Sequence, residues 1–208
     1  SAWPDMNWPD AECAIRTVVE YDRAGAAGLH VEDQVFPKRC GHLDGKELVP
    51  AEVMCDKVAA MAKHRPNPDF VIIARTDARH VSGFDEAVRR ANLYRAAGAD
   101  CIFPEGLESE AEFASFAKAS PGLLLANMTE FGKTPDITAK RFEELGYRIV
   151  IYPLSMMRLA MGHVVRGLEA LARDGSVRSV LPEMQTRKDL YDLLDYVPGR
   201  QWNYPRGR

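Results

Sequence analysis

The sequence predicts an α/β protein with a parallel sheet and helical crossovers. Short apolar runs alternate with amphipathic stretches about five times along the 208 residues, as strand–helix units do. The runs are nearly continuous, which is typical of strands covered on both faces. No Gly-x-Gly-x-x-Gly segment or phosphate loop follows any run. A dinucleotide-binding sheet therefore lacks its motif, and the alternative arrangement is a (β/α)8 barrel.

The apolar runs define the expected strands, which lie at residues 26–33, 69–78, 101–105, 122–130 and 147–153. The expected helices cover residues 50–66, 83–100, 108–120, 136–146 and 154–175, with a last helix near 187–196. A proline opens the first of these helices, and glycines follow the periodic residues at Gly98, Gly146 and Gly175. Thr138 suits the start of the helix that Gly146 ends.

The composition argues against several classes of protein. A net charge of −3 gives no electrostatic reason to expect a nucleic-acid partner. No apolar run approaches the roughly 20 residues of a membrane-spanning helix. The four cysteines, Cys13, Cys40, Cys55 and Cys101, lack the close pairing of zinc sites and suit free thiols. We therefore expect a cytoplasmic protein that binds neither nucleic acid nor membranes.

Polar side chains gather where the expected strands end. They are His30, Glu32 and Asp33 on the first strand, Arg75, Thr76 and Asp77 on the second, Glu105 on the third, Asn127, Thr129 and Glu130 on the fourth, and Arg158 one helical turn beyond the fifth. In a barrel these ends meet at one mouth, where the chemistry takes place. Acids, arginines and an amide at one rim suit an anionic substrate, with a cation to bridge like charges.

The stretch "EDQVFPKRCGHLDGKEL" places Cys40 between the cations Lys38 and Arg39 and the imidazole of His42. Neighbouring cations lower the pKa of a thiol from about 8.5, whereas a polyanionic substrate closing beneath the loop raises it again. The residues themselves leave two interpretations open. Cys40 is either a reactive thiol or an incidental cysteine on a solvated basic loop.

Six motifs carry a family resemblance: "GLHVEDQVFPKRCGHLDGKELV", "DFVIIARTDA", "IFPE", "LANMTEFGKTP", "YPLSMMR" and "MQTR". From about residue 10 to residue 197 the chain resembles the isocitrate lyase and phosphoenolpyruvate mutase superfamily, and most closely its lyases of 2-methylisocitrate. The resemblance implies a (β/α)8 barrel whose terminal helices exchange between subunits, usually in a homotetramer. It also implies cleavage of a small polycarboxylate, 2-methylisocitrate, to pyruvate and succinate with Mg2+, or alternatively Mn2+.

The resemblance also implies roles for individual residues. Cys40 matches the catalytic cysteine, a general acid on a mobile loop that also contains Gly41. Arg75 matches the arginine that holds the oxyanion side of the substrate, and Glu105 the glutamate that supports it. Carboxylate-binding positions match Asn127, Thr129, Arg158 and Arg187. Glu32 matches an acid of the magnesium shell that acts through metal-bound water. His30 faces the site from the same strand, and we expect it to take part in catalysis.

Some of these residues have simpler interpretations. His30 could be a packed core histidine, and Arg187 could cover a helix surface. Asp33 and Asp77 could cap helices or pair with arginines rather than contact a ligand. These alternatives stay open at the level of sequence.

The chain departs from the family pattern at its beginning. The first three strands of the family and an Asp-x-Asp metal pair precede the recognisable region, whereas "SAWPDMNWPD" has only Asp5 and Asp10. Five strands cannot close an eight-stranded barrel. We therefore expect residues 1–208 to be one partial barrel domain, with helices at about 176–197 that pack on or exchange with a neighbouring subunit.

The alternatives for function follow from the same departure. We prefer the explanation that the N-terminal strands are missing from this sequence. The alternative is a truncated, inactive subunit that acts only in assembly. Related lyases, hydrolases or decarboxylases of the dimethylmalate or oxaloacetate type are further candidates, because the scaffold hosts them too.

Overall fold

The protein is described by a computed structural model that covers residues 5–6, 11–40 and 45–201. It forms two compact units, Ser1–Ser155 and Met156–Arg208. The first contains a parallel sheet with its helices, and the second is helical. In the described ranges no helix is both long and apolar enough to cross a membrane.

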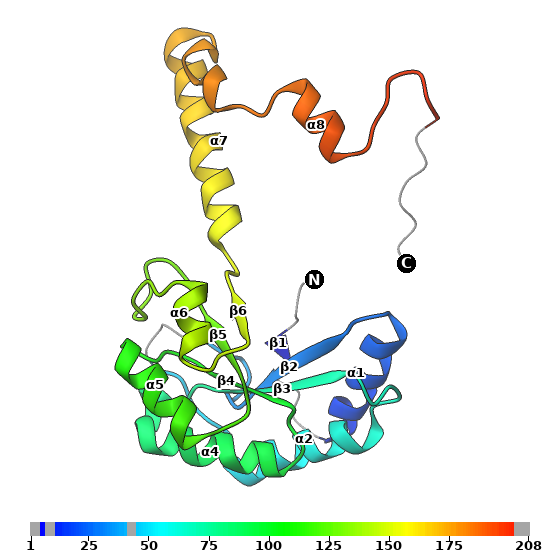
Figure 1. Ribbon diagram of the computed structural model, residues 1–208, viewed down its shortest axis with the longest axis vertical. Helices are drawn as coiled ribbons and strands as arrows, with labels where there is room; N and C mark the ends of the chain where they lie inside the picture. The colour runs from blue at the N-terminus through cyan, green and yellow to red at the C-terminus, as the bar shows by residue number, and fades with distance from the viewer. Residues whose placement is uncertain (1–4, 7–10, 41–44, 202–208) are drawn as a thin grey trace. The chain divides into compact units, whose positions relative to one another are not determined.

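The sheet has its strands in chain order, β1 to β6, with every neighbouring pair parallel (Figure 1). The strands are β1 (Asp5–Met6), β2 (Gly28–Glu32), β3 (Val71–Thr76), β4 (Cys101–Pro104), β5 (Leu123–Asn127) and β6 (Ile149–Ile151). A doubly wound sheet would reverse its order partway, so sequential order makes this a curled half-barrel and confirms the predicted barrel type. The five expected strands are present. β1 is an addition, too short to leave a pattern in the sequence.

Helices cover one face of the sheet in the first unit (Figure 1). They are α1 (Ala11–Arg23), α2 (Ala51–His64), α3 (Ala78–Ser82), α4 (Phe84–Ala96), α5 (Glu110–Ala119) and α6 (Ala139–Glu144). The predicted cap is confirmed, since the Thr138 hydroxyl accepts a hydrogen bond from the Arg141 amide at 3.2 Å. Gly146 follows α6 with a φ of +96°, a conformation that favours glycine.

The two faces of the sheet are packed differently. Alternate strand residues such as Val31, Ile72 and Ile102 join the large core between sheet and helices. The intervening residues on the concave face form a smaller cluster, which contains Ile73 and Phe103. The site residues continue this second set, because side chains two positions apart on a strand share a face. The strands therefore direct their terminal polar side chains toward the inside of the half-barrel.

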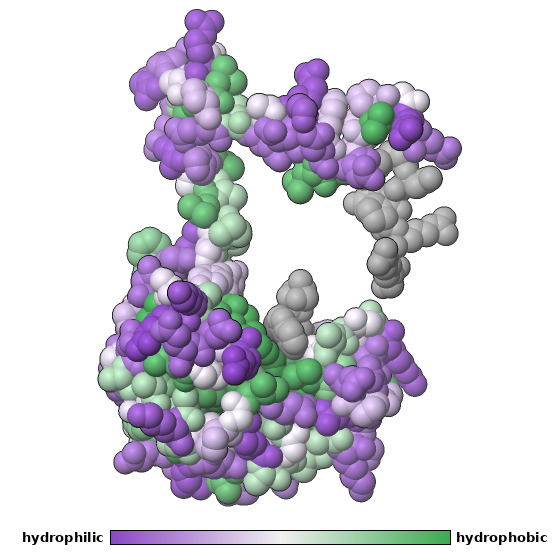
Figure 2. Space-filling view, viewed as in Figure 1, coloured by the Kyte–Doolittle hydropathy of each residue, from purple (hydrophilic) through white to green (hydrophobic). Residues whose placement is uncertain are grey.

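The second unit contains most of α7 (Ser155–Asp174), the 3-10 helix η1 (Arg178–Glu183) and α8 (Arg187–Leu193). Among its described residues only Ala170 is a buried hydrophobic. Apolar side chains recur along α7 at helical spacing and remain exposed, among them Met157, Met161 and Leu168. Figure 2 shows such apolar surface on the helical segment.

Candidate active site

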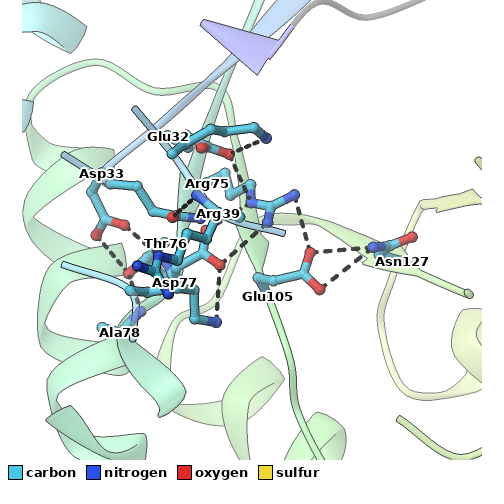
Figure 3. A network of polar contacts seen from close by, with 12 residues as sticks. Glu32, Asp33, Arg39, Arg75, Thr76, Asp77, Ala78, Glu105 and Asn127 are labelled. Carbon is cyan, nitrogen blue, oxygen red and sulfur yellow. Dashed lines mark hydrogen bonds and ion pairs between the residues drawn. The ribbon is translucent and has the colours of Figure 1, made fainter. Parts of the chain in front are cut away.

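Arg75, the penultimate residue of β3, lies at the centre of the candidate site (Figure 3). Its guanidinium pairs with Glu32 at 3.2 Å, Asp77 at 2.8 Å and Glu105 at 3.2 Å. All four residues are buried. Burial by itself lowers the pKa of Arg75, but the surrounding carboxylates, Glu105 foremost, raise it well above its usual value. Arg75 therefore remains a fixed positive charge.

Phe103 supports Arg75 from beneath. The guanidinium carbon lies 4.9 Å from the centre of the Phe103 ring, a cation–π contact. The His30 ring packs edge-on against the same phenyl ring at 5.8 Å and is buried. The simpler interpretation of His30 as a packed histidine thus has direct structural support, and its place on the concave face keeps it beside the site.

Glu105 links Arg75 to the next strand. Its Oε2 atom lies 3.2 Å from Arg75 Nη1 and accepts a hydrogen bond from Asn127 Nδ2 at 3.2 Å. Within the described part of the chain, the buried Oδ1 atom of Asn127 has no hydrogen-bond partner. The amide oxygen therefore has unused hydrogen-bonding capacity beside Glu105.

Asp33 and Asp77 serve structure and charge balance, as the simpler interpretation of the sequence predicted. The carboxylate of Asp33 accepts hydrogen bonds from the Thr76 hydroxyl, the Asp77 amide and the Tyr94 hydroxyl. It also pairs with Arg90 at 3.2 Å. Burial raises the pKa of Asp33 despite these donors. The residue ties the ends of β2 and β3 to α4.

The loop that contains Cys40 is attached to the sheet at its base. Gln34 and Leu48 form an antiparallel bridge, and the amide of Val35 donates to the carbonyl of Glu47 at 2.8 Å. The Cys40 side chain is exposed. Gly41 and His42 lie outside the described residues, as does Asp10.

Two lysines connect this loop to the site. Lys38 Nζ lies 3.1 Å from Glu32 Oε2, and Lys46 Nζ lies 3.3 Å from Asp77 Oδ1. The burial of Lys46 has no signal in the sequence, because a lysine beside a glycine in a polar stretch is typical of an exposed loop. Lys38 stands out in the sequence only as a neighbour of Cys40.

Thr129 lines a pocket of about 370 Å³ beyond the end of β5. The pocket is surrounded by Met128, Thr129, Glu130, Phe131, Thr134, Pro135, Asp136 and Tyr152. The hydroxyl of Ser155 donates to Glu130 next to it. Thr129 is thus two residues beyond Asn127 in the chain and lines a pocket that Asn127 does not line.

Arg158 and Arg187 belong to a different unit from Arg75. Arg158 lies in the first turns of α7 and Arg187 begins α8, both in the second unit. Their carboxylate-binding roles stay predictions, as do the catalytic roles of Cys40 and His30.

The sequence predicts a magnesium site, and the described residues supply only part of it. In the stretches that the structure covers, no group of three His, Cys, Asp or Glu side chains could hold a metal ion. Glu32 is a buried hard-oxygen donor at the mouth, and its Oε2 atom already lies close to Lys38 and Arg75. Because Mg2+ keeps several waters and uses few carboxylates, Glu32 suits an outer position, accepting hydrogen bonds from metal-bound water.

Comparison with curated proteins gives the chain a family. The family model described as phosphoenolpyruvate phosphomutase matches residues 9–172. "Probable 2-methylisocitrate lyase 1" of Corynebacterium glutamicum is 52% identical over 92% of this chain and 63% of its own length. "2,3-dimethylmalate lyase" of Eubacterium barkeri is 42% identical over 98% of this chain and 71% of its own. The chain thus spans about 63% of the first of these relatives.

Solved structures agree with this relationship. A complex of oxaloacetate acetylhydrolase with 3,3-difluorooxalacetate has a TM-score of 0.83 at 34% identity, over 91% of this chain and 64% of the other. A 2,3-dimethylmalate lyase described as a PEP mutase/isocitrate lyase superfamily member has a TM-score of 0.82 at 36% identity, with coverages of 91% and 63%. Phosphonopyruvate hydrolase with oxalate and Mg2+ has a TM-score of 0.76 at 32% identity, covering 91% and 66%. This chain belongs to the PEP mutase/isocitrate lyase superfamily.

Proposed function

We propose that the protein is a Mg2+-dependent carbon–carbon lyase that cleaves 2-methylisocitrate to pyruvate and succinate. One observation carries the proposal: a buried, permanently charged Arg75 is aligned by Glu32 and Glu105 at the rim from which the Cys40 loop emerges. The names of the relatives support this choice of substrate.

The reaction is a retro-aldol cleavage. A base takes the proton from the tertiary hydroxyl, the oxygen forms the carbonyl of pyruvate, and the adjacent carbon–carbon bond breaks. The electron pair of that bond moves onto the departing carbon and into its carboxylate, which becomes an enolate-like dianion. A general acid then delivers a proton to this carbon and releases succinate.

The residues of the rim stabilise the charge that develops. Arg75 cannot rotate freely because three carboxylates and a phenyl ring hold it, so its donors are oriented before the substrate arrives. One such preorganised donor typically contributes about 2.7–4 kcal/mol to lowering the barrier. Asn127, fixed through Glu105, offers a neighbouring amide to a substrate carboxylate or hydroxyl.

Cys40 is the proposed general acid. It is exposed, and it follows Arg39, whose main chain is held by the Gln34 side chain. The base of the loop is held beside the end of β2 by the Gln34–Leu48 bridge. Closure over the substrate would bring the thiol to the departing carbon.

When bound, Mg2+ would supply positive charge that offsets the negative charge on the pyruvate half. In this chain Glu32 would orient water in the metal shell. Lys38 and Arg75 both pair with the Oε2 atom of Glu32, which fixes the position of this carboxylate.

We also propose that the protein is a cytoplasmic homotetramer in which the C-terminal helices pack on a neighbouring subunit. The exposed apolar residues of α7, such as Met157 and Leu168, support this arrangement because a water-exposed apolar stripe is costly without a partner. Arg158 and Arg187 would then reach a substrate in the assembled protein.

A substrate panel tests the proposed activity. With Mg2+ present, pyruvate release is measured from 2-methylisocitrate and 2,3-dimethylmalate, glyoxylate release from isocitrate, and oxalate release from oxaloacetate. We expect 2-methylisocitrate to give the highest kcat/KM. A preference for dimethylmalate or oxaloacetate would instead favour the second candidate, which the named similarities to those enzymes support. Turnover of none of the four compounds would refute both candidates and leave a role in assembly.

A further inference from the structure

Lys46 is a lysine whose position requires explanation. Its side chain is only 1% exposed and its ammonium lies 3.3 Å from Asp77 Oδ1. Taking an ammonium out of water is unfavourable unless a nearby anion compensates. Lys46 is therefore held in place by Asp77, 31 residues further along the chain.

Asp77 is shared between Lys46 and Arg75. Its Oδ2 atom accepts a hydrogen bond from Arg75 Nε at 2.8 Å, and its Oδ1 atom accepts from Arg75 Nη2 at 3.2 Å. Lys46 donates to that same Oδ1 atom. The carboxylate that aligns Arg75 from one side is thus also the anchor of the chain returning from Cys40.

The chain leading to Cys40 ends in a similar contact. Lys38 pairs with Glu32, which is itself 3.2 Å from Arg75. The Gln34 amide holds the main chain of Arg39 by accepting from its N–H at 3.0 Å and donating to its carbonyl at 2.9 Å. The loop has two limbs, a leading one that contains Lys38 and a returning one that contains Lys46. Both limbs therefore contact carboxylates that orient Arg75.

The two limbs also touch each other. Gly45 adopts a φ of +75°, and a Cβ atom there would lie 2.9 Å from Arg39 Nη1. The absence of a side chain lets the returning limb lie against the leading one. The guanidinium of Arg39 and the backbone of Gly45 are therefore neighbours.

The net charge around Arg75 also depends on the two lysines of the loop. Three carboxylates, Glu32, Asp77 and Glu105, surround one guanidinium, and the two lysines of the loop bring the group to neutrality. Without Lys46 the group would carry one excess negative charge beside Arg75. That charge would repel a polyanionic ligand.

We propose that Lys46 is a positioning residue that, through Asp77, couples the placement of the Cys40 loop to the anion-binding capacity of Arg75. The idea rests on the proposed lyase function for its kinetic consequence alone. With the loop in place, Arg75 is aligned and its surroundings are neutral.

Hydrogen exchange tests the coupling without any need for turnover. In Lys46→Met we expect the amides of Val35, Arg39 and Val49 to exchange about threefold faster or more. Asp77→Asn should produce the same increase, and the double variant no further increase. Lys63→Met, which removes an exposed lysine from α2, is the matched control and should exchange as the wild type does.

Turnover provides the second readout. Lys46→Met should lower kcat about tenfold, and Lys46→Arg, which keeps the charge, should recover most of it. Unchanged exchange at Arg39 in both Lys46→Met and Asp77→Asn would overturn the coupling, whether or not pyruvate is formed. Faster exchange with unchanged kcat would also overturn it, because Lys46 would then be an anchor only. If Lys46→Met does not fold, Asp77→Asn decides by the same exchange criterion.

Discussion

The rim of the half-barrel and the C-terminal helices differ in which side chains they bury. In the first unit, charged side chains such as Glu32, Arg75 and Asp77 are buried and matched to partners. In the second, large apolar side chains such as Leu168 and Leu193 are exposed at 61% and 73%. Burying charged side chains and exposing large apolar ones both cost free energy. Each feature therefore indicates a role other than folding of the isolated unit. The rim suits an anionic ligand and the helices suit another protein surface.

The largest effect should follow from breaking the rim. Arg75→Met leaves three buried carboxylates without their shared cation, and we expect a loss of about 3–5 kcal/mol in the free energy of unfolding together with loss of turnover. Urea denaturation measures the first. Arg89→Met, which removes an exposed arginine paired with Glu86, is the control and should change stability by less than about 1 kcal/mol. Equal losses in the two variants would contradict the central role of Arg75.

Cys40→Ser should separate chemistry from stability within the first unit. The exposed thiol contributes little to packing, so the variant should unfold as the wild type does. Removing a general acid should lower the rate of pyruvate release about 100-fold or more. Cys55→Ser in α2 is the matched thiol control. Undiminished turnover would remove Cys40 from the mechanism.

Leu168→Glu should affect the second region alone. A charge in the apolar stripe of α7 should dissociate the proposed tetramer, which sedimentation velocity would detect, while the unfolding of the barrel unit should change by less than about 0.5 kcal/mol. Glu169→Gln, on a neighbouring exposed position, should leave the sedimentation coefficient unchanged. A monomeric wild type would refute the exchange of helices.

The smallest effect concerns Glu86, a surface residue that pairs with Arg89 and Arg90. The hydrogen bond from Arg89, aided by Arg90, lowers the pKa of Glu86 from 4.5 to about 2. A depressed pKa gives stability that is present above pH 4.5 and lost as the pH falls toward 2. Glu86→Gln should therefore cost about 0.5 kcal/mol at pH 7, and the difference from wild type should shrink across that window. A difference that persisted at pH 2 would contradict the ion pair as its source.

Most of the fold could be predicted from the sequence because its strands are continuous apolar runs. The run at 101–105 became β4 (Cys101–Pro104), and the helix expected at 154–175 became α7 (Ser155–Asp174). β1 (Asp5–Met6) was missed, since two residues carry no periodicity. The short α3 (Ala78–Ser82) was missed for a similar reason.

The site was predictable where residues belong to strand ends. Register places Glu32 directly opposite Arg75, so a rule about strand ends was sufficient to group them. Lys46 could not be predicted, because its burial depends on Asp77 in a distant part of the chain. The rule about strand ends also placed Asp33 in the site, which was wrong. The Asp33 carboxylate contacts Arg90 and Tyr94 of α4.

The antiparallel bridge between Gln34 and Leu48 has a consequence for how such proteins diversify. The chain leaves the end of β2 and returns beside it before α2 begins, so the segment between the two bridged residues is an insert whose length is independent of the strands. A segment taken from a relative with another substrate can be grafted between these two positions without shifting the alignment of β2 on β3. New substrate specificities can thus arise by replacement of this one segment.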